Sequence, residues 1–412
     1  MEFLSNAIVN IGEWIEGLLL SAGLSDVLAS LIMTIISSIV IVFIPVVVVI
    51  FLVWGYRKAS ARMQGRIGPN SSGTWAGPGG IVQTFADAIK MLTKEDIRPQ
   101  GVDLIPYNLA PILVFFVALM IWAVVPFGPG TVIGADLNIG IFFILAFSSA
   151  ALFVILMAGW SSNNKYSAVS AFRSVALLIS YEIPQLLSVL VVVMVVGSLS
   201  MQEIVAAQEG VMLLIALPVP ALVFFVASLA EINARPFELL EAESELVAGY
   251  QTEYSGMKFG MFYLAEFINS VAVSAVFTTL FLGGWRGPWV DSAPILGTLW
   301  FTLKVTFMVM VWMFFQITLP RLRIDQILNF NWKFLVPVAL LNVCVISVVN
   351  KLALDAYPPP GNNWARAGIL LAANVVIALA VWGVLAVAAR RERQRQDSWT
   401  AAHVAEEMEV GA

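Results

Sequence analysis

Long apolar runs separated by short polar segments dominate this chain. Nine runs are long enough to cross a bilayer as helices of about twenty residues: 28–54, 106–126, 139–160, 175–197, 211–230, 259–283, 297–319, 333–354 and 367–389. The ten-residue alternation typical of a membrane β-barrel is not present. The pattern therefore predicts an all-α integral membrane protein, a polytopic bundle of about nine transmembrane helices.

Prolines lie inside several of the predicted spans, at positions 184, 218, 220 and 337. A proline removes one helical hydrogen bond, and a membrane bundle tolerates this when neighbouring groups satisfy the freed carbonyl. These prolines therefore predict kinks rather than the ends of spans.

Two other segments have apolar residues at helical spacing on one side only. Ahead of the first span, Ile8, Ile11, Ile15 and Leu19 predict a surface helix. After it, the apolar positions of 81–92 lie opposite Asp87, Lys90 and Lys94. Both patterns are typical of amphipathic helices at the membrane interface.

Lysine and arginine are concentrated in alternate loops. They follow the first, third, fifth and seventh spans and the last one, whereas the loops after the second and fourth spans have none. Because basic residues favour the cytoplasmic side, we expect the N-terminus outside and the C-terminus in the cytoplasm. The predicted organisation is an interfacial segment over 1–27, an eight-span core over 28–354, a loop and additional transmembrane helix over 355–389, and a polar cytoplasmic tail over 390–412.

The composition fits this fold and limits the chemistry. Hydrophobic residues make up 60% of the chain and charged residues 12%. With one cysteine, Cys344, and one histidine, His403, the chain cannot build a disulfide framework, a Cys/His metal site or an iron–sulfur site by itself. Any redox centre is therefore expected on partner subunits.

Acidic residues gather within 229–267, in a chain that is otherwise apolar. They are Glu231, Glu238, Glu241, Glu243, Glu245, Glu253 and Glu266. A carboxylate near hydrocarbon costs roughly 2.5–3.5 kcal/mol on insertion scales, and burial and coupling move such groups toward titration near neutral pH. The cluster indicates a proton path, with a solvated acidic loop as the alternative. Glu182, inside another apolar run, is expected to face a cavity or a partner, or to be neutral.

Six motifs occur in order along the chain: GRIGPN from Gly65, FADAIKMLTKED from Phe85, SYEIP from Ser180, the PFEL and ESELVAGY segment that follows Ala230, LAEF from Leu264 and PRLRIDQ from Pro320. From the first span to about the eighth, the chain resembles the NuoH family, whose members are membrane subunits of the proton-pumping NADH-quinone oxidoreductase, respiratory complex I. The resemblance implies a protein that docks the redox arm onto the membrane arm. It also implies that the cytoplasmic loops form part of a quinone chamber and that buried acids begin a proton path.

The resemblance also implies site residues, matched one by one. The implied quinone-binding residues are Arg57, Arg66, Asp87, Phe259, Phe262 and Tyr263, of which the three aromatic residues are alternatively core. The implied proton path comprises Glu182, Glu231, Glu241, Glu243, Glu245, Glu253, Glu266, Arg173, Arg321, Arg323 and Asp325. No catalytic residue and no metal ligand is implied. The chain departs from the family pattern at Tyr56, Ala234 and Glu238, where the family usually has Glu, Arg and Asp.

The implied substrate is a quinone, whether menaquinone, ubiquinone or plastoquinone, with FMN and iron–sulfur clusters on partner subunits and no metal or flavin on this chain. The implied partners are iron–sulfur and quinone-site subunits of the hydrophilic arm and small and antiporter-like membrane subunits, in a bacterial cell (inner) membrane and without nucleic acid.

Three alternatives stay open. The chain could be the homologous subunit of a membrane-bound hydrogenase or of a ferredoxin-driven quinone reductase, which the co-purifying subunits would reveal. It could be a free-standing proton or ion transporter, which would act without partners. It could also be a structural anchor, for which proton pumping would survive Glu241→Gln.

Overall fold

The computed structural model describes residues 7–21, 23, 25–70, 79–129, 135–240, 243–290, 293–356 and 363–410. Within these residues the regular structure is helical, without strands. The first half comprises α2 (Ala7–Ser21), α3 (Asp26–Met63), α4 (Val82–Thr93), α5 (Leu104–Met120), the 3₁₀ helix η1 (Ile121–Val124), α6 (Gly140–Ser161), α7 (Lys165–Val196) and α8 (Met201–Ala207). The second half comprises α9 (Leu213–Ala216), α10 (Pro218–Glu231), α11 (Glu243–Leu246), the 3₁₀ helix η2 (Gly249–Gln251), α12 (Gly256–Phe281), α13 (Ile295–Thr318), α14 (Ile324–Phe330), the π-helix η3 (Asn331–Leu335), α15 (Val336–Ala356) and α16 (Asn363–Val410).

Eight helical stretches of the described chain are long and apolar enough to cross a bilayer. This confirms the predicted all-α polytopic membrane fold. Several helices extend beyond the predicted spans. α3 and α7 continue into the loops, and α16 runs without a break through the predicted ninth span and the predicted tail.

The span predicted over 211–230 needs a correction. The structure divides it into α9 and α10, with a break at Leu217, whose φ and ψ are −128° and 60°. Pro218 and Pro220 have no backbone N–H and therefore cannot continue the hydrogen bonds of α9. With 14 residues, α10 is only about 21 Å long, shorter than the roughly 30 Å hydrocarbon core.

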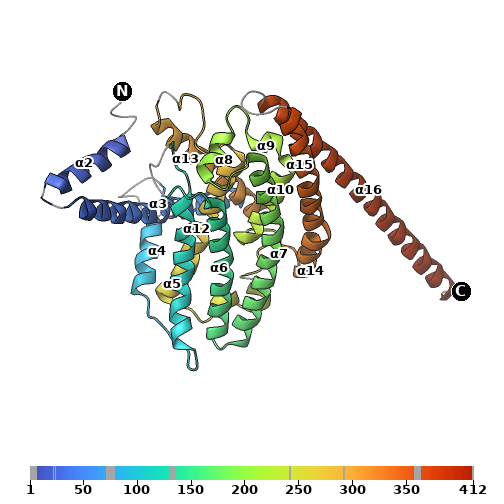
Figure 1. The fold of residues 1–412 in the computed structure, drawn as a ribbon. Coiled ribbons are helices and arrows are strands. Elements are labelled where there is room, and N and C mark those ends of the chain that lie inside the picture. The colour runs from blue at the N-terminus through green and yellow to red at the C-terminus, as the bar shows by residue number, and fades with distance from the viewer. Residues whose placement is uncertain are drawn as a thin grey trace.

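The helices α5, α6 and α7 stand side by side, while α3 runs across the view and α16 projects away from the bundle (Figure 1). α6 and α7 approach closely at Gly159, where a Cβ atom would lie only 2.3 Å from the Cβ of Ala171. α7 is preceded by Asn164, whose side chain accepts the N–H of Tyr166, and is followed by Gly197, which has a positive φ of 84°. These local signals fix the two ends of the helix that carries Glu182.

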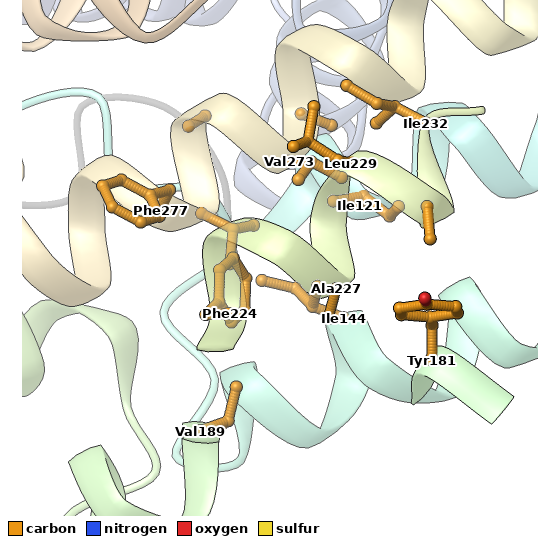
Figure 2. Packing of buried hydrophobic residues seen from close by; sticks show 14 of the residues in the cluster. Ile121, Ile144, Tyr181, Val189, Phe224, Ala227, Leu229, Ile232, Val273 and Phe277 are labelled. Carbon is orange, nitrogen blue, oxygen red and sulfur yellow. The ribbon is translucent and has the colours of Figure 1, made fainter. Parts of the chain in front are cut away.

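Apolar side chains join α10 and α12 to the bundle. Figure 2 shows Phe224 of α10 near Phe277 of α12, with Ile144 and Val189 of α6 and α7 close by. The rings of Phe224 and Phe277 lie 6.1 Å apart, and Phe224 is 1% exposed. Polar side chains in this region therefore need polar partners or a cavity.

The two predicted amphipathic segments are helical, as α2 and α4. On α4, Phe85, Ile89 and Leu92 are exposed, whereas Asp87 is partly buried and pairs with Arg57 of α3. The apolar face of α4 is thus turned away from the protein. The location of both helices at the membrane interface stays a prediction.

Candidate functional site

A polar cavity lies between α5, α6, α7, α10 and α12. It has about 100 Å³ of room for the centres of water molecules. One water needs roughly 10–15 Å³ on that measure, so several waters fit. Apolar side chains form most of the wall, and its acids and amides are Glu182, Gln185, Glu231, Asn233, Glu266 and Asn269. Three glutamates far apart in the sequence therefore share one cavity.

Glu231 is the best-defined of these acids. It is the last residue of α10. Ser148 donates a hydrogen bond of 2.6 Å to its Oε1, and Gln185 donates one of 2.5 Å to its Oε2. Among the described residues, the lining of this cavity includes no lysine or arginine. The carboxyl group is thus held by neutral donors, without a permanent counter-charge.

Glu182 and Gln185 lie one helical turn apart on α7 and face the same cavity. Glu182 lies close enough to Glu231 for the two carboxyl groups to interact electrostatically. The arrangement can therefore accept and release protons over a short distance.

A second pocket lies between α3, α12 and α13. It has about 240 Å³ of room for water centres, and its polar lining includes Tyr56, Glu238, Tyr263 and Gln316. Asn233 and Glu266 line both this pocket and the first cavity. These two residues therefore form the junction between the two polar spaces.

Asn233 holds this junction in place. It is 5% exposed and has a positive φ of 53°, which asparagine tolerates better than most residues. Its Oδ1 accepts the backbone N–H groups of Leu239 and Leu240 at 3.2 and 3.4 Å, and its Nδ2 donates to Glu266 at 3.5 Å. The two N–H groups fix the orientation of the amide, so its NH₂ group points toward Glu266.

The loop acids have different surroundings. Ser167 and Ser170 of α7 donate to the carbonyls of Tyr250 and Leu240 and attach the loop to the helix. Glu245 then pairs with Arg173, and Arg321 lies 3.7 Å away. The hydrogen bond from Arg173 and the nearby guanidinium groups lower the pKa of the Glu245 carboxyl.

The other described path residues are not among the residues that line the cavity. Glu253 accepts a hydrogen bond of 2.5 Å from Asn164 at the start of α7. Arg323 and Asp325 are exposed at the start of α14. Glu243 begins α11, and only its backbone is described. Glu241 lies outside the described residues.

The implied quinone-binding residues lie on α3, on α4, on α12 and, for Arg66, just after α3. Arg57 and Asp87 form an ion pair of 2.5 Å between α3 and α4. Arg66 is exposed and donates to Gln64. Tyr263 lines the second pocket, and its ring lies 4.8 Å from that of Phe259.

Phe262 is 1% exposed, and its ring meets those of Tyr250 and Tyr254 edge-on. Although one side of Phe262 lines the first cavity, its place in the packing is that of a core residue.

Four residues of the cavity with a neutral hydroxyl or amide side chain were not among the predicted site residues: Ser148, Gln185, Asn233 and Asn269. A signal was present, because a lone amide in an apolar run needs a partner. Gln185, three residues after Glu182, could have been found in this way. Among the described residues, no group of three or more metal-ligating side chains occurs.

Comparison of the sequence with known proteins shows the family of this chain. The family model described as NADH dehydrogenase matches residues 36–347. The NuoH protein of NADH-quinone oxidoreductase from Dehalococcoides mccartyi (strain CBDB1) is 50% identical over 305 residues, covering 74% of this chain and 83% of that protein. The NuoH protein of Carboxydothermus hydrogenoformans is 47% identical over 295 residues, 72% of this chain and 83% of the relative. Because these matches cover most of the chain, the chain belongs to the NADH dehydrogenase family that includes the NuoH proteins of NADH-quinone oxidoreductase.

Proposed function

We propose that this chain is the NuoH component of a proton-pumping NADH-quinone oxidoreductase in a bacterial cell membrane, with its N-terminus outside and its C-terminus in the cytoplasm. Family membership and the polytopic helical fold support this assignment. With one cysteine and one histidine, the chain depends on partner subunits for iron–sulfur clusters, and FMN is likewise assigned to partner subunits. Those partners comprise the hydrophilic redox arm and the other membrane subunits.

The observation that carries the proposed proton path is the shared cavity of Glu182, Glu231 and Glu266. Glu266 and Asn233 connect it with the second pocket, which is lined by Tyr56, Glu238 and Tyr263. A proton can pass between such groups through waters, because both spaces have room for several. The path runs from the second pocket past Glu266 to Glu231 and Glu182.

The quinone chamber is proposed to lie above the cytoplasmic loops, closed by partner subunits. The Arg57–Asp87 pair and Tyr263 are its proposed contributors from this chain. Reduction of quinone changes the charge in the chamber and shifts the proton affinity of the nearby acids. Moving one charge against 100 mV needs roughly 2.3 kcal/mol, which corresponds to less than two pKa units at about 1.4 kcal/mol each. A shift of less than two pKa units in these acids, caused by quinone reduction, is therefore sufficient to move one proton against 100 mV.

The test uses the assembled complex reconstituted in liposomes. Glu231→Gln keeps the size of the side chain and removes its proton exchange, so we expect NADH-driven proton uptake to fall roughly tenfold or more. Glu203→Gln is the matched control, since Glu203 is an exposed acid of α8 outside both polar spaces. Normal proton uptake in Glu182→Gln, Glu231→Gln and Glu266→Gln alike would refute the path and leave a structural anchor. Proton conduction by the isolated chain would instead favour a free-standing transporter.

A further inference from the structure

Two helices that carry cavity acids each contain a proline at a critical position. Pro184 lies in α7, two residues after Glu182, and Pro220 lies near the start of α10, which ends at Glu231. Proline has no N–H, so the carbonyl group four residues earlier lacks its usual helical partner. For Pro184 this is the carbonyl of Ser180, inside α7. The carbonyl of Ala216, the last residue of α9, is left without a helical partner where the helix breaks at Leu217, before Pro218 and Pro220. In a bilayer, water does not replace the missing bond, and the protein must satisfy the carbonyl itself.

Asparagine side chains from the C-terminal helices donate to both carbonyls. Asn331 of the π-helix η3 donates through Nδ2 to the carbonyl of Ser180. Asn374 of α16 donates through Nδ2 to the carbonyl of Ala216 at 3.2 Å. Both asparagines are fully buried. Asn331 thus reaches the carbonyl that Pro184 leaves without a helical partner, and Asn374 reaches the carbonyl at the end of α9, just before the break at Leu217.

Neighbouring groups fix the orientation of the Asn374 amide. Its Oδ1 accepts a hydrogen bond of 3.0 Å from Asn342 of α15, and its Nδ2 also donates to the carbonyl of Leu370 at 2.9 Å. Its NH₂ group therefore faces Ala216. Closer to the start of α16, Arg366 donates a hydrogen bond of 2.5 Å to the carbonyl of Val195 at the end of α7. α16 thus makes polar contacts to the ends of α7 and α9, although it lies beyond the matched region 36–347.

We propose that Asn331 and Asn374 are positioning residues of the cavity. Asn331 satisfies the carbonyl freed by Pro184 and thereby fixes the position of α7 and of Glu182. Asn374 satisfies the carbonyl of Ala216 at the break that precedes α10 and thereby fixes the start of α10, and with it the position of Glu231. α16 is then part of the device that aligns the acids, rather than an additional anchor. The effect on proton transfer rests on the proposed function, whereas the effect on the helices does not.

A double-mutant cycle at Pro184 tests the first pair. Asn331→Leu leaves the carbonyl of Ser180 without a donor, and we expect amide hydrogen exchange across 176–187 to become about fivefold faster or more in the purified complex. Pro184→Ala returns an N–H within an already continuous helix. In Pro184→Ala/Asn331→Leu, amide exchange across 176–187 should therefore slow again, most of the way to the wild-type rate. Asn329→Leu is the matched control, the same substitution at an exposed position of α14. Faster exchange that Pro184→Ala does not reverse would overturn the proposed role of Asn331.

Asn374 is tested in the same way on α10. Asn374→Leu should accelerate exchange across 213–224 about fivefold or more, because the buried carbonyl of Ala216 then has no donor. Val376→Leu, an exposed apolar change on the same helix, should leave exchange unchanged. Exchange in Asn374→Leu equal to that of the control would overturn the proposal for α16.

The functional readout separates positioning from general damage. In the assembled complex, Asn331→Leu and Asn374→Leu should lower the number of protons moved per NADH about twofold or more, with the quinone KM unchanged. Pro184→Ala/Asn331→Leu should restore the ratio. An unchanged ratio in variants with faster exchange would overturn the positioning role. If the proposed proton path is wrong, Glu231→Gln will pump normally. The hydrogen-exchange results for Asn331 and Asn374 can be interpreted in either case.

Discussion

The acids of the cavity and the acids of the loop between α10 and α12 come largely from one stretch of sequence, yet they have opposite surroundings. Glu231 is bound by a hydroxyl and an amide inside the bundle. Glu245, fourteen positions later in the sequence, is 46% exposed and lies between Arg173 and Arg321. A guanidinium partner fixes the charge of a carboxylate, whereas neutral partners leave its protonation free to respond to neighbouring charges. The comparison indicates which acids exchange protons and which hold the structure together.

The largest effect on proton translocation is expected when a cavity acid is given a cationic partner, as Glu245 has in the loop. Gln185→Lys places a cation beside Glu231, and at an effective dielectric constant of about 20 two charges 4 Å apart attract by roughly 4 kcal/mol. The cation would hold Glu231 ionised, so we expect proton translocation in liposomes to fall well over tenfold. Gln202→Lys, at a partly buried amide of α8 outside this cavity, tests for the effect of an added charge alone. Pumping that survives Gln185→Lys would contradict the difference drawn between the two regions.

The next effect concerns the aromatic residues between the two regions. Phe262→Ala removes a buried ring from contact with Tyr250 and Tyr254, and we expect the free energy of unfolding to fall by about 3–5 kcal/mol. Tyr263→Phe removes only a hydroxyl at the second pocket and should change stability by about 1 kcal/mol or less, while raising the quinone KM. Thermal unfolding and quinone kinetics of the complex measure both. A raised KM with unchanged stability in Phe262→Ala would instead make Phe262 a quinone contact.

A smaller, pH-dependent effect is expected at Glu245. Because its pKa is lowered in the folded protein, the pair with Arg173 stabilises the loop fully above the ordinary glutamate value of 4.5. This contribution is lost as the pH falls through the lowered pKa. Since the carboxylate is 46% exposed, Glu245→Gln should cost only about 1 kcal/mol at neutral pH.

Limited proteolysis of the 243–254 segment at a series of pH values measures this difference. The wild type and Glu245→Gln should converge on acidification. Glu203→Gln, with an exposed acid on α8, should show no such convergence. A difference between wild type and Glu245→Gln that grows as the pH falls would exclude the ion pair as its cause.

The smallest effect on stability is expected at the Arg57–Asp87 pair. Its side chains are 41% and 31% exposed, so Asp87→Asn should change the free energy of unfolding by less than about 1 kcal/mol, and less still in high salt. If the pair contributes to the quinone chamber, the quinone KM should rise severalfold. Asp96→Asn breaks another ion pair after the same helix and should leave the KM unchanged. Equal quinone KM values for the two variants would show that the Arg57–Asp87 pair does not contribute to quinone binding.

Much of the fold could be read from the apolar runs, because hydrocarbon accepts only segments whose backbone groups are satisfied internally. The runs over 139–160 and 297–319 match α6 and α13 closely. The run over 211–230 did not give a full span, since apolar composition does not show how Pro218 and Pro220 interrupt the helix. The length of the apolar run over 175–197 also did not reveal that α7 begins at Lys165, ten residues before that run.

The candidate site was predictable only in part. Glu182 and Glu231 were conspicuous because acids in apolar surroundings are costly. Their meeting in one cavity depends on how α7, α10 and α12 pack, which no local pattern specifies. Asn233 was not found, because asparagine in a loop is common and its link between the two polar spaces exists only after residues 239 and 240 bond to its side chain.

The sequence by itself determined that this chain is a helical membrane protein of its family, which residues are acidic and where prolines interrupt the helices. These properties are local, since hydropathy and the missing proline N–H act within a few residues. The tertiary structure decided which acids face a cavity with neutral partners and which meet arginine. It also decided that Asn331 and Asn374 donate to the carbonyls of Ser180 and Ala216, across separations of 151 and 158 residues. Such contacts depend on packing between distant helices, because each buried polar group takes the partner that the fold brings within reach.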